Sequence, residues 1–139
     1  MTTGNPATRE QNITPFLYGL CHVLARSLTT HDRRLVLCMS WGKSKSGVSL
    51  PDHAFAMSPT TGLACDARGW FPDGASLLQN ECGEPLDHWG DLMTWSTGYE
   101  ANRMIEEAME DGRLRRPTIN EAIDATLLSR KLLAECPTD

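Results

Sequence analysis

The chain has 139 residues, of which 40% are hydrophobic and 22% are charged, and its formal net charge is -5 at pH 7. This composition is typical of a soluble globular protein and excludes a disordered or fibrous chain. The acidic balance argues against nucleic acid as the main partner, because binding to a phosphate backbone requires a positive field.

Membrane and secreted proteins are also disfavoured. No apolar run approaches the roughly 20 residues that a membrane-spanning helix needs, and the polar start of the chain lacks the pattern of a signal peptide. The five cysteines are odd in number and irregularly spaced, which favours reduced thiols over a disulfide framework. We therefore expect a cytoplasmic protein without a membrane partner, in which thiol chemistry is available.

The first twelve residues differ from the rest of the chain. They include glycine, proline and small polar residues without apolar periodicity, and they predict a flexible arm over residues 1–12. The remaining length suits one domain, which at this size buries about two thirds of its unfolded surface. We therefore expect a single domain over residues 13–139.

The first apolar periodicity belongs to a helix. Leucines recur at the helical interval in the segment FLYGLCHVLARSL, and Thr14 followed by Pro15 is typical of a helix start. This pattern predicts a helix over residues 14–29. Gly19 weakens its middle and leaves a second possibility open, in which a loop ends there and a shorter helix has Cys21 in its first turn.

Strand patterns follow the helix. The apolar run LVLCMSW predicts a buried strand over residues 35–41, and GKSKSGVSLP predicts a surface loop over residues 42–51. DHAFAMS alternates with the period of a strand over residues 52–58. The turn PTTG and the segment LACDARGW then complete a β-hairpin over residues 52 to about 67.

The C-terminal half is predicted to be mainly helical. Residues 71–97 contain glycine, proline and short apolar clusters and predict irregular structure with one or two short helices. Residues 99–112 predict a helix, and Thr118 with Glu121 forms a capping box for a last helix that ends near residue 135. The core face of this last helix is expected to comprise Ile119, Ile123, Leu127 or Leu128, and Leu132. The predicted fold is α+β, with an N-terminal helix packed on a small antiparallel sheet and helices at the C-terminal end.

Cys21 is the candidate nucleophile, because a helix start and a nearby imidazole make a thiol reactive by favouring its thiolate. The hairpin supplies the imidazole of His53 and the carboxylate of Asp66. A turn at residues 59–60 puts these two residues opposite each other on neighbouring strands, about 5 Å apart. The carboxylate then orients the imidazole, which takes the proton of the thiol. His22 adjoins Cys21 and is expected to point about 100° away around the helix, so it is not predicted to be the base.

The same residues carry a resemblance to a known family. YGLCHVLA resembles the nucleophile segment of papain-like cysteine peptidases, and HAFAMSPTTGLACDARGW resembles the strand-turn-strand of the wider papain-like and transglutaminase-like superfamily. The resemblance covers about residues 16–72. It implies a papain-like core in which Cys21 is the nucleophile, His53 the base and Asp66 the orienting acid. We expect a thiol hydrolase or acyltransferase that acts on a peptide, isopeptide or glutamine amide of a protein or peptide, without a cofactor or metal.

The chain departs from the family pattern in the group that stabilises the oxyanion. Papain-like enzymes carry a glutamine a few residues before the cysteine, whereas Gln11 lies ten residues before Cys21. The backbone N–H of Cys21 and one unassigned side chain are the remaining candidate donors. The small size indicates a minimal member of the superfamily without the two-lobed cleft of larger peptidases.

Two other classes of function stay open. A non-catalytic protein-binding or inhibitor module on the same scaffold would suit the acidic balance and the surface loops. A zinc site can be drawn from Cys65, Cys82 and His88, completed by Asp66 or His53, although no close Cys-x-x-Cys or His-x-x-x-His pair exists. The identity of the substrate and the oligomeric state are not determined by the sequence.

Overall fold

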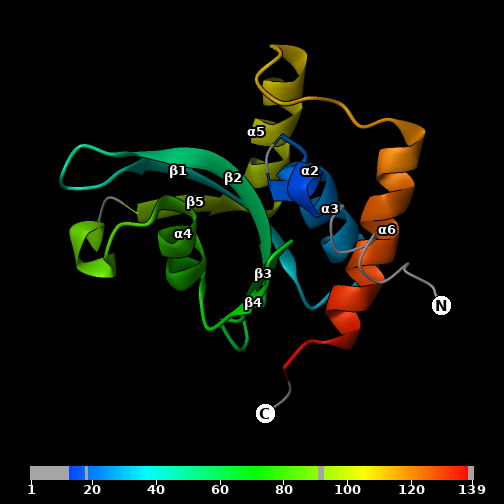
Figure 1. Cartoon of the computed structure of the whole chain (residues 1–139), viewed down its shortest axis with the longest axis horizontal. Helices are drawn as coiled ribbons and strands as arrows, with labels where there is room; N and C mark the ends of the chain where they lie inside the picture. Colours follow the sequence, from blue (N-terminus) through cyan, green and yellow to red (C-terminus); the bar gives the residue numbers. More distant parts are fainter. Residues whose placement is uncertain (1–12, 18, 91–92, 138–139) are drawn as a thin grey trace.

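The computed structural model describes residues 13–17, 19–90 and 93–137 (Figure 1). The arm predicted over residues 1–12 lies outside the described residues. In chain order, the helices and strands are α2 (Thr14–Leu17), α3 (Cys21–His31), β1 (Val36–Lys43), β2 (Ser49–Met57), β3 (Ala64–Asp66), β4 (Gly69–Phe71), α4 (Gly74–Cys82), η1 (Leu86–His88), β5 (Met93–Thr97), α5 (Gly98–Glu110) and α6 (Ile119–Ala134). None of the helices in these ranges is both long and apolar enough to cross a bilayer.

The described strands form an antiparallel sheet in the order β4-β3-β2-β1-β5. Different helices cover its two faces: α3, α5 and α6 pack on one face and α4 packs on the other (Figure 1). The predicted α+β fold is therefore confirmed, with an N-terminal helix on an antiparallel sheet and helices that follow towards the C-terminus.

The alternation of side chains along β2 explains how the two faces are built. Ala54 and Ala56 lie in the clusters that contain α3, whereas Phe55 lies in the cluster of α4 with Leu77. Alanine side chains are short, so the helix approaches the backbone of the strand closely. The first turn of α3 is thereby placed against the middle of β2.

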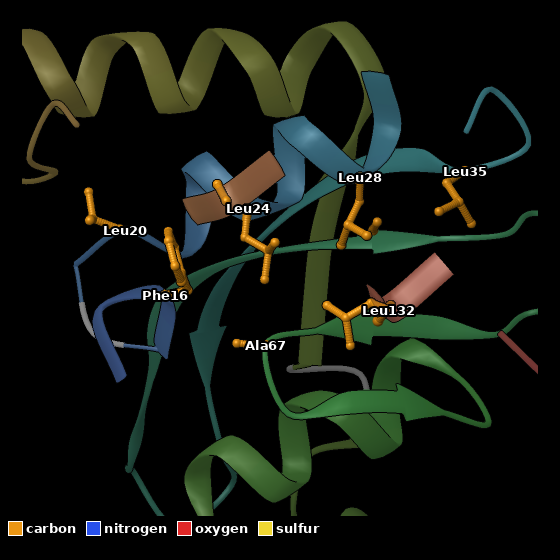
Figure 2. Packing of buried hydrophobic residues seen from close by; sticks show 10 residues of the cluster. Phe16, Leu20, Leu24, Leu28, Leu35, Ala67 and Leu132 are labelled. Atoms are coloured by element: carbon orange, nitrogen blue, oxygen red, sulfur yellow. The ribbon is translucent and has the colours of Figure 1, made fainter. Parts of the chain in front are cut away.

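The core cluster that holds α3 contains residues from both the N-terminal and the C-terminal parts of the chain. Leu24 and Leu28 of α3 pack with Phe16 of α2 and Leu132 of α6 (Figure 2). The indole N–H of Trp70 in β4 donates a hydrogen bond of 2.8 Å to the carbonyl of Leu132, which ties the end of α6 to the edge of the sheet. The position of α3 therefore depends on the C-terminal helix as well as on its own sequence.

The first helical segment is broken, so the prediction of one continuous helix over residues 14–29 is wrong. Gly19 has a φ of 102°, in the left-handed region that favours glycine, and the chain turns there between α2 and α3. The possibility that the sequence left open, a shorter helix after Gly19, is the observed one. Cys21 is consequently the first residue of a helix.

The sheet extends further than its sequence pattern indicates. The strand predicted over residues 35–41 is confirmed, but β1 continues to Lys43, which pairs with Ser49 at the start of β2. The prediction of a loop over residues 42–51 is therefore wrong in its length, and the connection contains only residues 44–48. Residues 45–49 at this end of the ribbon are exposed, whereas Ser44 is buried and its hydroxyl accepts a hydrogen bond from the Val48 amide.

The segment over residues 71–97 is more regular than predicted. It contains the expected short helices α4 and η1, but residues 93–97 form β5, which pairs with β1 at the edge of the sheet. This strand was not predicted, because five residues next to a glycine-containing stretch show too little alternation. Pairing with β1 supplies the hydrogen bonds that the local sequence does not indicate.

The last helix begins as predicted and buries the C-terminal part of its predicted core face but not the N-terminal part. The Thr118 hydroxyl accepts a hydrogen bond from the Glu121 amide, and the Glu121 carboxylate accepts one from the Thr118 amide, so the capping box is confirmed. The prediction that Ile119 and Ile123 belong to the core is wrong, because both side chains are exposed. The prediction is confirmed for Leu132, which is buried with Ala125 and Ser129, and Leu128 packs against the same cluster.

Candidate active site

The thiol of Cys21 lies at the start of α3, against the backbone of β2. Its Sγ accepts a hydrogen bond of 3.4 Å from the Ala54 amide, and the residue is only 5% exposed. The N-cap residue Leu20 provides no side-chain hydrogen bond to the helix. The first turn of a helix carries a partial positive charge, so this position favours the thiolate over the thiol.

The imidazole of His53 and the carboxylate of Asp66 form a buried hydrogen-bonded pair. Nε2 of His53 lies 2.8 Å from Oδ2 of Asp66, and the residues are 1% and 2% exposed. The prediction that they lie directly opposite each other is wrong, because Ala56 pairs with Cys65 and the register is displaced by two residues. A displacement of two leaves both side chains on one face of the sheet, so they meet diagonally instead.

The thiol and the imidazole influence each other's ionisation. Burial opposes ionisation of Cys21, but hydrogen bonding to His22 and His53, the charge of His53 and the Ala54 amide outweigh burial and lower its pKa to about 6. Burial also opposes the charged form of His53, but hydrogen bonds to Asp66 and Cys21 raise its pKa to about 10. Because Nε2 is bound to Asp66, Nδ1 is the ring nitrogen left for the thiol. Between these pKa values, thiolate and imidazolium coexist as a pair.

Cys21 differs from the other buried cysteines in this respect. Burial alone raises the pKa of Cys38 to about 12, and burial followed by the charge of Asp66 raises the pKa of Cys65. Burial and neighbouring acids raise the pKa of Cys82 to about 11. Cys21 is therefore the thiol whose surroundings favour nucleophilic chemistry.

His22 is closer to this chemistry than its sequence position indicates. Its imidazole is buried, and hydrogen bonding to it contributes to the lowered pKa of Cys21, although its Nδ1 makes no regular hydrogen bond within the described residues. Its Nε2 lies 2.9 Å from the carbonyl oxygen of Arg115. A carbonyl oxygen only accepts, so Nε2 of His22 is the donor of this hydrogen bond.

Arg68 is a site residue that the sequence did not reveal. Its backbone N–H donates to Oδ1 of Asp66 over 2.8 Å, and its Nη2 donates to Oδ2 over 2.6 Å. The same Nη2 reaches the carbonyl oxygen of Leu77 in α4 at 3.1 Å. Burial opposes ionisation of Asp66, but the hydrogen bonds of His53 and Arg68 lower its pKa, so the carboxylate stays charged.

The acidic side of the site already contains a cation. Among the described residues, the ligating atoms of His53, Asp66 and Glu81 lie within 4.8 Å of one another, as metal ligands do. Nη2 of Arg68, however, lies 2.6 Å from Asp66 and 3.6 Å from Glu81, so a guanidinium neutralises this cluster. The zinc site drawn from the sequence is wrong. Among the described residues, Cys65, Cys82 and His88 do not form a group of possible metal ligands.

Comparison with known proteins adds no identification. No protein-family model matches the chain, and neither a curated protein nor a solved structure matches it. The geometry and electrostatics of Cys21, His53 and Asp66 are therefore what indicates a function.

Proposed function

We propose that this protein is a thiol hydrolase or acyltransferase that acts on a peptide, isopeptide or glutamine amide. The observation that carries the proposal is the arrangement of three buried groups: a helix-initiating thiol, an adjacent imidazole, and a carboxylate 2.8 Å from the far nitrogen of that imidazole. Thiol enzymes of this class need these groups in this order, because the carboxylate orients the base and the base activates the thiol.

The reaction follows from the charges of the three groups. The Cys21 thiolate attacks the carbonyl carbon of the substrate, and the negative charge moves to the carbonyl oxygen. The imidazolium of His53 donates its Nδ1 proton to the leaving amine, the carbon–nitrogen bond breaks, and a thioester remains on Cys21. Water, or an acceptor amine, then attacks the thioester while His53 takes its proton. The carbon–sulfur bond breaks, the acid or the new amide is released, and Cys21 returns to the thiolate. Asp66 stays ionised throughout and holds Nε2.

The oxyanion of the intermediate needs hydrogen-bond donors. The first backbone N–H groups of a helix have no partner within that helix, and the N–H of Cys21 is one of these groups. It is our candidate for one donor, because it adjoins the sulfur that forms the new bond. Gln11, which lies ten residues before Cys21, is outside the described residues.

The resemblance to papain-like and transglutaminase-like enzymes supports the same proposal. The chain order of Cys21, His53 and Asp66, with a helix followed by antiparallel strands, is the order of that superfamily. We extend the proposal to a minimal papain-like core with a protein or peptide as substrate. We also place the protein in the cytoplasm, since all five of its cysteines are unpaired and a nucleophilic thiol must stay reduced.

Selective labelling and substitution test this function together. Iodoacetamide at pH 7 should modify Cys21 before Cys82, whose pKa is raised to about 11. Cys21→Ala should abolish amide hydrolysis and acyl transfer on a peptide library while the circular dichroism spectrum is retained. Cys82→Ala is the matched control and should keep full activity. Activity that survives in Cys21→Ala contradicts the proposal.

A protein-binding module is the second candidate function. The exposed apolar side chains of α6 favour it, because Ile119 is 81% exposed and Ile123 lies one turn further along the same helix face. A partner that binds the wild type and the Cys21→Ala protein equally well, but not an Ile119→Ser variant, would favour binding over chemistry.

A further inference from the structure

A distant part of the chain packs in the same core cluster as Cys21. The connection between α5 and α6, residues 111–118, runs past the first turn of α3 (Figure 1), and we call it the strap. A nucleophile that is only 5% exposed cannot meet a peptide bond without a local opening. The attachments of the strap therefore decide how a substrate reaches the site.

Two polar contacts attach the strap to residues next to Cys21 and His53 in the sequence. The carbonyl oxygen of Arg115 accepts a hydrogen bond of 2.9 Å from Nε2 of His22, the residue directly after Cys21. Nη1 of Arg113 lies 3.4 Å from Oδ2 of Asp52, the residue directly before His53. The strap thus touches both sequence neighbours of the thiol–imidazole pair.

One apolar side chain anchors the strap. Leu114 is the only buried residue of the strap, all of which the structure describes, and it belongs to the core cluster that contains Cys21 and Met109. Its amide donates a hydrogen bond of 3.0 Å to the carbonyl of Ala108 at the end of α5. The Arg113–Asp52 pair, in contrast, is exposed on both sides and adds little. The strap is held mainly by Leu114 and by the His22 hydrogen bond.

The geometry of the strap resembles that of a bound peptide. Residues 115–117 belong to neither a helix nor a strand, and one of their carbonyl groups is bound by a buried side chain. A pocket of about 370 Å³ opens beside them, and its lining includes His22, Arg26, Arg116 and Pro117. The space next to the strap is therefore already hollow where a chain could enter.

We infer that the strap occupies the substrate path, and that an extended peptide takes its place with a backbone carbonyl on Nε2 of His22. This inference rests on the proposed function and specifies its substrate class as an extended peptide chain. His22 becomes a substrate-binding residue that holds the carbonyl of Arg115 in the free protein. The strap is then an internal cover of the nucleophile.

Loosening the apolar anchor tests the cover. Leu114→Ala should raise the rate at which iodoacetamide modifies Cys21 by about tenfold or more, because truncation of a buried leucine removes most of its packing. The rate is read by mass spectrometry of the peptide that contains Cys21. Leu78→Ala is the matched control: Leu78 of α4 is also buried but lies in the core cluster on the other face of the sheet, so this variant should leave the rate near that of the wild type.

Each result of this experiment decides the inference. An unchanged labelling rate in Leu114→Ala, or an equal rise in Leu78→Ala, contradicts the inference that the strap covers Cys21. If the alanine variant does not fold, Leu114→Val tests the same point. Its truncation is smaller, so the expected rise in the labelling rate of Cys21 is smaller too. These outcomes are separate from the proposed function: fast labelling without any amide turnover overturns the proposed function and leaves the cover standing.

A peptide added in trans tests the substrate path. A blocked synthetic peptide with the sequence of residues 111–118 should slow the labelling of Cys21 in Leu114→Ala, because it can occupy the vacated path. Free amino acids of the same composition are the control and should not protect. Labelling that stays equally fast with millimolar peptide overturns the assignment of an extended peptide to this path.

Discussion

The candidate active site has an acid end, at Asp66, and a thiol end, at Cys21, and these two ends are held in different ways. At the acid end, Asp66 is fixed by Arg68, two residues away in the same β3–β4 turn. At the thiol end, His22 is fixed by Arg115, which lies 93 positions away in the sequence. The acid end is therefore built by a local turn, whereas the thiol end is completed only when the C-terminal half of the protein packs on α3.

This difference separates two requirements of a thiol enzyme. The orienting acid must not move, and a buried carboxylate with several charge-assisted hydrogen bonds meets that need. The nucleophile must become accessible, and a strap with one buried anchor can open without disturbing the sheet. We expect substitutions at the acid end to change stability and substitutions at the thiol end to change access.

His53→Ala removes the link between the two ends and should have the largest effect. Amide turnover should fall by more than about 10³-fold, because both activation of the thiol and protonation of the leaving amine are lost. The pKa of Cys21, about 6 in the wild type, should rise towards the ordinary value of a thiol. The pH dependence of iodoacetamide labelling measures this shift, and a midpoint that stays near 6 would contradict the assignment of His53.

Among variants that each remove one partly exposed charged side chain, Arg68→Ala should lower the free energy of unfolding most. It leaves the buried carboxylate of Asp66 without its guanidinium, which costs roughly 3 kcal/mol for a broken buried pair. Urea unfolding measures the loss. Arg34→Ala is a matched control, since Arg34 holds Asp32 with the same spacing and contacts but is largely exposed, so its removal should change little. Equal losses of stability in both variants would contradict the claim that Arg68 fixes the acid end more firmly than an exposed arginine fixes its aspartate.

As the pH falls, Cys21 should lose its reactivity before protonation of Asp66 destabilises the fold. The pKa of Cys21 is lowered to about 6, so its thiolate is present above pH 6 and labelling should fall as the pH drops through that value. The pKa of Asp66 is lowered from 3.8, so the stability from its charge is complete above that value and is lost only at lower pH. Labelling and circular dichroism recorded on one pH series test this order. Coincident transitions would show that the two ends form one unit.

Asp52→Asn should have the smallest effect. It removes only the exposed attachment of the strap to Arg113, so the labelling rate of Cys21 should rise less than about threefold. The rise should disappear at high salt, because an exposed ion pair is screened. Glu100→Gln is a suitable control, because it breaks an exposed pair with Arg103 on α5 away from the strap. A rise as large as that expected for Leu114→Ala would mean that the ion pair anchors the strap.

The sequence predicted the three central residues because each has a distinct local signal. Cys21 follows a glycine that can break a helix, and His53 lies on an alternating strand that a recognisable turn connects to Asp66. The predicted register differed by two residues, yet the pairing survived because the side-chain period of a strand is two. The face of a strand is thus easier to predict than the partner of each residue.

Arg68 was not predictable in the same way. An aspartate followed two residues later by an arginine that binds it occurs repeatedly in this protein, and the motif itself is identical each time. These pairs are Asp32 with Arg34, Asp66 with Arg68, and Asp111 with Arg113. Only burial distinguishes the pair at Asp66, and burial is a property of the completed fold. The contact between His22 and Arg115 is hidden for the same reason.

The three candidate catalytic groups and the strap come from separate stretches of the chain. Cys21, His53 and Asp66 all precede residue 67, whereas the strap begins at residue 111. Under the proposed function, mutations in the strap would alter which molecules reach Cys21 while His53 and Asp66 stay unchanged. Such a division would allow selectivity to diverge between descendants of this protein while the chemical step is inherited.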